Sequence, residues 1–241
     1  MRHGIVADIH SNLAAFQAVL DDMEARGGVD GIWCLGDIVG YGPDPSECIA
    51  LLRQYAHLSV AGNHDWASIG KVDVSDFNPD AAAACRWTAG QLTEEEVAYL
   101  EGLPLTVRRG EFTIVHGSPR EPIWEYVVSA RTALASFDSF DTNYCLIGHS
   151  HMPLVFEYIG GTCVLQPLPE ELRLADNRLI INPGAVGQPR DGDPSASYAV
   201  YDEDEMAVYH YRVAYDVEAT QERMLRQGLP EFLVARLSYG R

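Results

Sequence analysis

Short apolar runs alternate with helix-like segments over the first 63 residues, and this order constrains the fold more than any other feature. The runs are GIVAD (4–8), IWCLGD (32–37) and LSVAGN (58–63). Helix-like segments follow the first two runs, one after Asn12, a typical N-cap, and one beginning near Pro45. Strands that alternate with helices in this way are parallel and joined by right-handed crossovers. The sequence therefore predicts an α/β fold.

The pattern changes beyond residue 80. An alanine-rich segment precedes Thr93 and Glu96, which form a capping box, and residues 79–103 predict a helical side layer or cap. Strand-like runs return at 112–117 and 144–149, separated by a helix-like stretch around 130–137. Two helices around 217–239 are expected to close the chain. The last third also predicts strands at 154–159, 162–166, 178–182, 197–202 and 207–213.

The composition narrows the class of protein. A chain of 241 residues with 47% hydrophobic residues is expected to form one domain over residues 1–241. The net charge of −18 argues against broad binding of nucleic acid or anionic membranes. Five cysteines without C-x-x-C spacing indicate a reducing compartment. Since no apolar stretch is long enough to span a bilayer and no signal peptide is recognisable, we expect a cytoplasmic protein.

Five of the apolar runs lead into residues that bind metals. Groups just past the carboxyl ends of strands gather along one edge of an α/β sheet, so these residues are expected to meet. The set contains two carboxylates, one amide and four imidazoles, which suits manganese, iron, zinc, cobalt or nickel rather than calcium. The residues are Asp8, His10, Asp37, Asn63, His116, His149 and His151.

Seven ligands are too many for one ion. They suit two ions that share a bridging carboxylate, an arrangement that activates a bridging water and clamps the oxygens of phosphoryl transfer. Two divalent ions would also make the site locally cationic, which reconciles an acidic protein with an anionic substrate.

The motifs D-x-H, G-D, G-N-H-D, H-G and G-H-x-H stand in this order between Asp8 and His151. Together they resemble the calcineurin-like metallophosphoesterase superfamily. The segment NPGAVGQPRDGDPSASYAVYD (182–202) also resembles the C-terminal signature of a bacterial branch of small phosphoesterases. The resemblance implies an αββα sandwich of two mixed β-sheets flanked by helices.

The resemblance also implies the division of the ligands. Asp37 would bridge two divalent transition-metal ions, manganese being the first expectation. The first ion would take Asp8, His10, Asp37 and His151, and the second would take Asp37, Asn63, His116 and His149. The implied function is hydrolysis of a small phosphomonoester, phosphodiester or nucleotide by in-line attack of a metal-bridging hydroxide.

His64 resembles the general acid of the superfamily, which protonates the leaving alkoxide. The protein phosphatases of the superfamily carry an Asp-Arg pair where this chain has Gly40 and Tyr41, and an arginine where it has Ala61. A role as a protein phosphatase is therefore not expected. The departure also leaves open which residue orients His64, with Asp65 and Tyr41 as the candidates.

Other residues have two readings. Arg190 is either a bidentate ligand for substrate phosphate or a solvated loop residue. Trp66, Phe77 and Trp124 either line a pocket or pack in the core, the second being favoured. Two other functions stay open: a non-catalytic metal- or phosphate-binding scaffold, and a metal-dependent nuclease, which the acidic charge and the lack of a basic-aromatic stripe disfavour.

Overall fold

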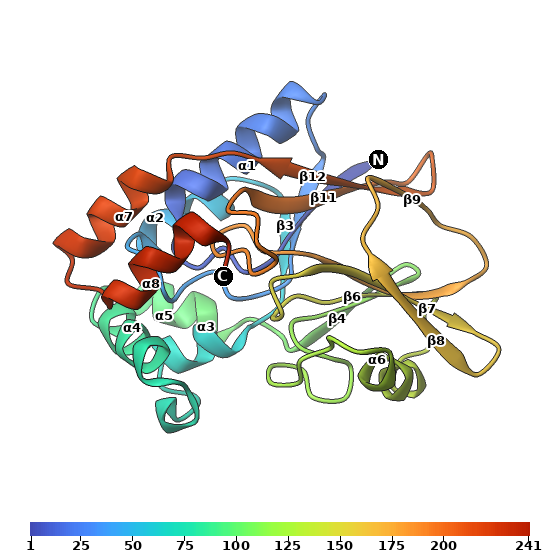
Figure 1. Cartoon of the computed structure of the whole chain (residues 1–241), viewed down its shortest axis with the longest axis horizontal. Helices are drawn as coiled ribbons and strands as arrows, with labels where there is room; N and C mark the ends of the chain where they lie inside the picture. The colour runs from blue at the N-terminus through green and yellow to red at the C-terminus, as the bar shows by residue number, and fades with distance from the viewer.

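Two six-stranded β-sheets pack face to face, with helices on their outer sides (Figure 1). The computed structural model describes all 241 residues. Sheet A has the order β3 (His57–Ser59), β2 (Gly31–Cys34), β1 (Arg2–Val6), β11 (Ala196–Asp202), β12 (Ala207–Val213) and β9 (Glu171–Arg173). Sheet B has the order β4 (Thr106–Arg109), β5 (Phe112–Val115), β6 (Tyr144–Leu146), β10 (Arg178–Pro183), β7 (Pro153–Ile159) and β8 (Thr162–Pro167).

Both sheets are mixed. In sheet A, β1, β2 and β3 are parallel, whereas β11 runs antiparallel to β1. In sheet B, β5, β6 and β10 are parallel, and the flanking strands β4 and β7 are antiparallel to their neighbours. The prediction of two mixed sheets flanked by helices is confirmed.

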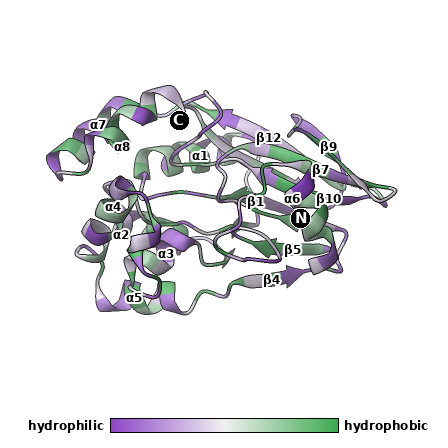
Figure 2. Cartoon of the chain, turned by 60° about the horizontal axis from the view of Figure 1, so that its bottom comes forward, coloured by the Kyte–Doolittle hydropathy of each residue, from purple (hydrophilic) through white to green (hydrophobic).

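Alternate residues of β1 belong to different layers. Ile5 packs in the cluster between the sheets with Ile114 and Leu146 of sheet B. The next residue, Val6, packs with Phe16 of helix α1 on the outer side of sheet A. Figure 2 shows this central position of apolar strands, with hydrophilic residues toward the periphery. The core therefore fixes the two sheets against each other.

Helices cover both outer faces. Sheet A is covered by α1 (Leu13–Ala25), α2 (Pro45–Leu52) and α5 (Glu94–Glu101), whose apolar residues share one cluster. Sheet B is covered by α6 (Ala130–Ser136). The remaining helical elements are α3 (Asn63–Ser68), α4 (Pro79–Ala89), α7 (Val217–Arg226), α8 (Glu231–Arg236) and the short 3₁₀ helices η1 (Val74–Asp76), η2 (Phe137–Ser139) and η3 (Leu237–Tyr239).

A separate apolar cluster joins the C-terminal helices to the rest of the chain. Tyr41, from the loop after β2, packs there with Ala84 of α4, Met224 of α7 and Leu233 of α8. In Figure 1 the C-terminus accordingly lies near the middle of the molecule, beside α8. None of the helices combines the length and the apolar content that crossing a bilayer requires.

Five predicted strands extended too far. The runs ending at Asp8, Asp37, Asn63, Gly117 and His149 leave the sheets two to four residues earlier, at Val6, Cys34, Ser59, Val115 and Leu146. Asn63 begins helix α3, which was not predicted, and β4 and β9 were not predicted either. The early exits have a physical cause, because the polar residues that follow each strand turn away from the sheet to meet one another.

Candidate metal centre

The predicted ligands lie where strands of the two sheets end. Eight residues other than glycine have a positive φ, and five of them are predicted ligands: Asp8, His10, Asp37, His149 and His151. A left-handed backbone is costly for residues with a Cβ and persists only where the surrounding structure enforces it. The fold therefore holds these five side chains in place at the cost of local strain.

The ligands form two buried groups. Asp8, His10 and His151 make one, and Asp37, His116 and His149 make the other, with the ligand atoms of each group within 4.8 Å of one another. In the first, the Nε2 atoms of His10 and His151 are 3.1 Å apart. In the second, His116 Nε2 lies 3.1 Å from His149 Nδ1. Such convergence of ring nitrogens suits a shared cation.

Asn63 joins the second group, since its Oδ1 lies 3.1 Å from His116 Nε2. All seven predicted ligands are thus brought together, in the two sets that the family resemblance implies.

Asp37 stands between the groups. Its Oδ2 is 3.6 Å from His10 Nε2 and 3.3 Å from His116 Nε2. Its Oδ1 accepts a hydrogen bond from the backbone N–H of His64 at 2.8 Å, whereas the buried Oδ2 has no hydrogen-bond partner. Burial alone would raise the pKa of Asp37. The neighbouring imidazoles, His116 foremost, instead hold this pKa well below its usual value. A buried carboxylate oxygen without a hydrogen-bond partner is stabilised by a nearby cation.

The second nitrogen of each imidazole is tied to a backbone carbonyl oxygen. The distances are 3.2 Å from His10 Nδ1 to Val39, 2.8 Å from His116 Nδ1 to Leu35, 2.5 Å from His151 Nδ1 to Gln188 and 3.3 Å from His149 Nε2 to Trp124. A ring N–H that donates to a carbonyl fixes the tautomer and leaves the other nitrogen free to bind a metal. In each of the four histidines the remaining ring nitrogen is therefore available to a metal ion.

The charge balance also fits metal ions. Asp8, Asp37 and Asp65 are buried together, and burial followed by the charge of Asp37 raises the pKa of Asp65 to about 7. Two divalent cations would relieve this repulsion between carboxylates. The donor set, the orphaned oxygen and the charge balance agree, so the residues present fit a centre of two ions.

His64 lies beside the first group of ligands. Its ring is 4.8 Å from that of His10 and 4.2 Å from that of Tyr41, measured between centroids. Burial lowers the pKa of His64 to about 4. Gly40 makes room for the ring, because a Cβ at that position would lie 2.6 Å from His64 Nδ1. The glycine that departs from the protein-phosphatase pattern is thus required by the packing of His64.

Cys85, from helix α4, is the side chain within hydrogen-bond distance of His64, with its Sγ 3.3 Å from Nδ1. The sequence offered Asp65 and Tyr41 as orienting residues, and their contacts differ. Tyr41 contacts the ring of His64, but the Asp65 carboxylate accepts hydrogen bonds from the backbone N–H groups of Asp37, Val39 and Gly62. Asp65 therefore holds the loop that carries Asp37 rather than the imidazole.

This role of Asp65 makes a stability prediction. Asp65→Ala would leave three buried N–H groups without an acceptor, so we expect the free energy of unfolding of the metal-free protein to fall by about 3 kcal/mol. Asp65→Asn, which keeps one oxygen acceptor, should lose less. Urea unfolding would measure the stability of both variants. The control is Asp73→Ala, because the exposed Asp73 carboxylate accepts a hydrogen bond from the Ser75 N–H alone. Equal losses for Asp65→Ala and Asp73→Ala would contradict the assignment.

Arg190 lies close to the centre and is partly buried. Its Nη2 donates to Tyr41 Oη and to Gln188 Oε1, both at 3.3 Å. Its positive charge contributes, after burial, to the lowered pKa values of His64 and His151. The reading of Arg190 as a solvated loop residue is therefore wrong.

The aromatic residues near the motifs differ in position. Phe77 packs edge-on against His64 at 5.0 Å and contacts Trp124 at 5.3 Å, whereas Trp66 packs with Lys71. Tyr126, which is 49% exposed, stacks on His149 with the ring centroids 3.9 Å apart. Neither Tyr126 nor Cys85 was identified from the sequence, because each reaches the site from an irregular or alanine-rich segment that contains no recognisable motif.

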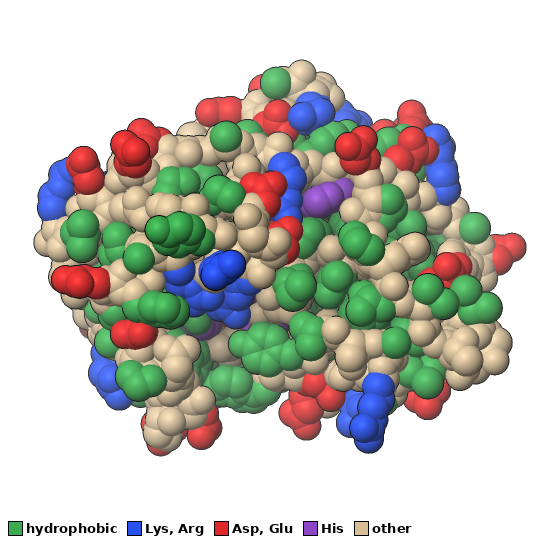
Figure 3. All heavy atoms as spheres, viewed as in Figure 1, with side chains coloured by type: hydrophobic (Ala, Val, Ile, Leu, Met, Phe, Trp, Pro, Cys, Tyr) green, Lys and Arg blue, Asp and Glu red, His purple; other side chains and the backbone are tan.

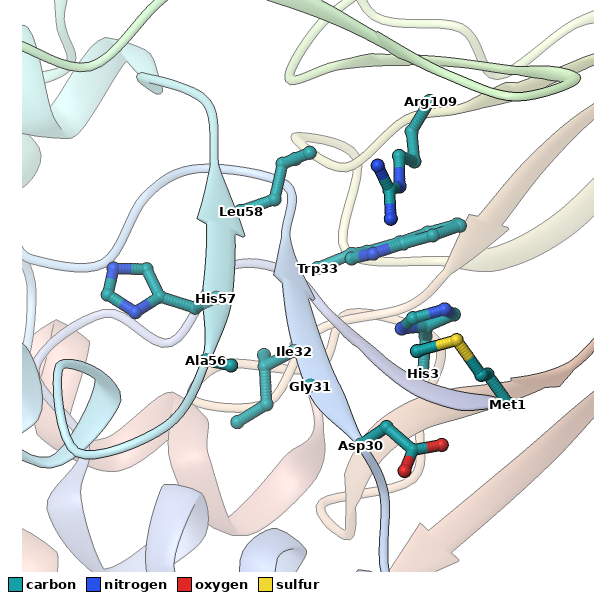
Figure 4. Close-up of a pocket in the computed structure, with 10 residues that line it drawn as sticks. All are labelled: Met1, His3, Asp30, Gly31, Ile32, Trp33, Ala56, His57, Leu58 and Arg109. Carbon is teal, nitrogen blue, oxygen red and sulfur yellow. The ribbon is translucent and has the colours of Figure 1, made fainter.

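The other histidines have ordinary structural contacts. His3 stacks on Trp33 and lies 3.0 Å from Glu203 Oε1, and His210 Nε2 lies 2.8 Å from Ser197 Oγ. Figure 4 shows His3 and His57 around a hollow of about 330 Å³. This hollow is lined by residues at the amino ends of β1 and β2, so it lies at the edge opposite to the ligands.

Comparison with known proteins places these features in a family. Residues 1–206 match the calcineurin-like phosphoesterase superfamily domain. An uncharacterised protein of Methanocaldococcus jannaschii is 40% identical over 98% of this chain and 97% of its own length. The crystal structure of a metallophosphoesterase from Sphaerobacter thermophilus is 49% identical, with a TM-score of 0.90 over 100% of this chain and 99% of that one.

A more distant similarity covers part of the chain. A symmetrical bis(5'-nucleosyl)-tetraphosphatase of Erwinia tasmaniensis is 31% identical over 88 residues, which are 33% of this chain and 32% of that protein.

Proposed function

The chain belongs to the calcineurin-like phosphoesterase superfamily and is a hydrolase of phosphoester bonds, and from this premise we propose that it cleaves a small phosphorylated substrate at a centre of two divalent transition-metal ions. The substrate class is a phosphomonoester, a phosphodiester or a nucleotide. The observation that carries the proposal is the position of Asp37 Oδ2, which is buried, unpartnered and within 3.6 Å of ring nitrogens from both groups of ligands.

The assignment of ligands follows the geometry. Asp8, His10 and His151 would hold one ion, and Asn63, His116 and His149 the other, with Asp37 shared between them. The mixed nitrogen and oxygen donors suit manganese, iron, zinc, nickel or cobalt, and the family resemblance makes manganese the first expectation. When bound, the ions would supply an activated water and charge stabilisation for in-line displacement at phosphorus.

His64 would act as the general acid. Its Nδ1 is engaged by Cys85, and its Nε2 makes no hydrogen bond within the protein, so Nε2 is available to a leaving oxygen. Burial raises the pKa of the Cys85 thiol to about 12, so Cys85 stays a neutral thiol, whose sulfur would accept a hydrogen bond from Nδ1–H of the charged imidazolium. A phosphate dianion beside the ring would favour the charged imidazolium and oppose the effect of burial. Arg190 would bind a substrate oxygen.

Metal content tests the proposal directly. We expect purified protein, stripped with a chelator and reloaded with manganese, to bind two ions per chain, because the seven ligands form two groups around one shared carboxylate. Elemental analysis after gel filtration would measure the ratio. His57→Ala, which removes a histidine hydrogen-bonded to Tyr99 outside the centre, should not change it. Saturation at a single ion would refute the two-metal assignment.

The alternatives have less support. The complete ligand set and His64 argue against a non-catalytic scaffold. The net charge of −18 argues against a nuclease.

Two further expectations agree with the structure. The five free cysteines fit the expected cytoplasmic location. The two sheets with their shared core fit the expected single domain over residues 1–241.

A further inference from the structure

Three aromatic side chains from two loops border one side of the candidate metal centre. Phe77, directly after η1, packs edge-on against His64 with the ring centroids 5.0 Å apart, and it contacts Trp124 at 5.3 Å. Tyr126, two residues after Trp124 in the segment between β5 and α6, stacks on His149 at 3.9 Å. These three rings, the aromatic wall, therefore connect the proposed general acid with a proposed ligand of the second ion.

The aromatic wall is open to solvent, in contrast to the rest of the centre. Tyr41, which packs against two imidazoles of the centre, is only 5% exposed. Phe77 and Trp124 are half-buried, and Tyr126 is 49% exposed. The rings of Tyr126 and His149 lie within 25° of parallel, so His149 covers one face of the tyrosine. The other face of Tyr126 is therefore open.

The loop that carries Tyr126 is held from both sides. Ser118 Oγ accepts hydrogen bonds from two backbone N–H groups of the loop and donates to Glu125 Oε2 at 2.6 Å. Val127 is 1% exposed and packs in the apolar cluster beneath α6. The ring of Tyr126, which lies between Glu125 and Val127 in the chain, is thus positioned before a ligand binds, and little conformational entropy is lost on binding.

An open aromatic face suits a planar ligand. A flat group that stacks on the ring of Tyr126 would bury apolar surface that is otherwise in contact with water. Nucleobases have this property, because every base has a π-face and stacks on an aromatic side chain without a particular set of hydrogen-bond partners. A sugar or an alkyl chain has no such face.

The aromatic wall lies where the part of a substrate without phosphate would extend. The metal ligands and Arg190 would bind the phosphate, and His64 would face the leaving oxygen. Because Phe77 contacts His64, the wall begins beside that oxygen, and a group attached to the oxygen would extend along the wall. In Figure 3, a hollow beside α8 contains basic side chains and is bordered by hydrophobic side chains. This combination suits a ligand with an anionic part and a planar apolar part.

We infer that Tyr126, with the rest of the aromatic wall beside it, is a platform on which the base of a nucleotide stacks, so that the site selects nucleotides over phosphoesters without a base. The inference rests on the proposed function and chooses one of its three substrate classes. It also gives Phe77 and Trp124 the pocket-lining role that the sequence did not favour.

The test compares two ligands that differ in the presence of a base. Adenosine 5'-monophosphate and ribose 5-phosphate share the sugar and the phosphate, and each is measured as a competitive inhibitor of nitrophenyl phosphate hydrolysis by the manganese-loaded protein. We expect the wild-type protein to bind the nucleotide about tenfold or more tightly, since one base–aromatic stack contributes a factor of this size. Tyr126→Ala should weaken binding of the nucleotide by about this factor and leave binding of ribose 5-phosphate unchanged.

Two further variants control the comparison. Tyr126→Phe keeps the stacking face and should keep the preference for the nucleotide. Tyr55→Ala removes a tyrosine that is 37% exposed in the turn before β3, at the amino end of that strand, and should change neither inhibition constant.

The platform is overturned if the two ligands inhibit the wild-type protein equally, or if the preference for the nucleotide survives Tyr126→Ala. An equal loss for both ligands in Tyr126→Ala would also overturn it, because the ring would then only support His149. If the wild-type protein hydrolyses no phosphoester, the proposed function fails, and calorimetric titration with the same two ligands still decides the platform.

Discussion

Asp37→Asn is expected to lower kcat/KM by roughly 10³-fold or more, a larger loss than Asn63→Ala causes. The carboxylate is the ligand that both groups share, and its negative charge holds both ions. Removing it forfeits several kcal/mol of transition-state stabilisation, which corresponds to a rate change of this size. Asn63 contributes a neutral oxygen beside His116 alone.

The two variants are compared at the same manganese concentration, with metal content measured in each. Asparagine keeps the volume of Asp37 and an oxygen that can accept from His64 N–H, so the comparison isolates the charge. Circular dichroism of the metal-free proteins would control for misfolding. Equal losses, or a larger loss in Asn63→Ala, would show that Asp37 is not the bridge.

His64→Ala is expected to reduce turnover on an alkyl or nucleoside phosphoester by about 10²- to 10⁴-fold and on a nitrophenyl ester far less. An alkoxide must be protonated as its bond to phosphorus breaks, whereas nitrophenolate leaves as a stable anion. The side chain of His64 has its Nδ1 near Cys85 rather than among the ligand atoms, so metal content should stay at the wild-type value.

Three measurements decide this role: kcat on an alkyl ester, kcat on a nitrophenyl ester, and bound metal. His57→Ala serves as the matched control, because it removes an imidazole hydrogen-bonded to Tyr99 instead. Equal losses on both esters would indicate that His64 positions the substrate. A drop in bound metal would make His64 a ligand.

The residues that meet at the candidate metal centre could be predicted to lie together because each one follows an apolar run. A buried strand of a parallel sheet leaves a local pattern, and the carboxyl ends of such strands share one edge. Asp8, His116 and His149 could therefore be placed together without knowledge of the tertiary structure. The strand ends were less predictable, since apolar residues such as Ile147 continue the pattern after β6 has ended at Leu146.

Residues that reach the centre from elsewhere could not be predicted. Cys85 lies in an alanine-rich helix, and it approaches His64 because α4 packs against Tyr41. Such contacts depend on helix packing, which leaves no local periodicity in the sequence.

The left-handed backbone at five ligand positions has a consequence for choosing substitutions. Alanine is disfavoured at positive φ, whereas asparagine tolerates it. An alanine scan of Asp8, His10, Asp37, His149 and His151 would combine loss of a ligand with backbone strain of about 1 kcal/mol or more at each position. Glycine at these positions relieves the strain without supplying a new ligand atom, so the effect of the lost ligand can be measured separately from the stability of its loop.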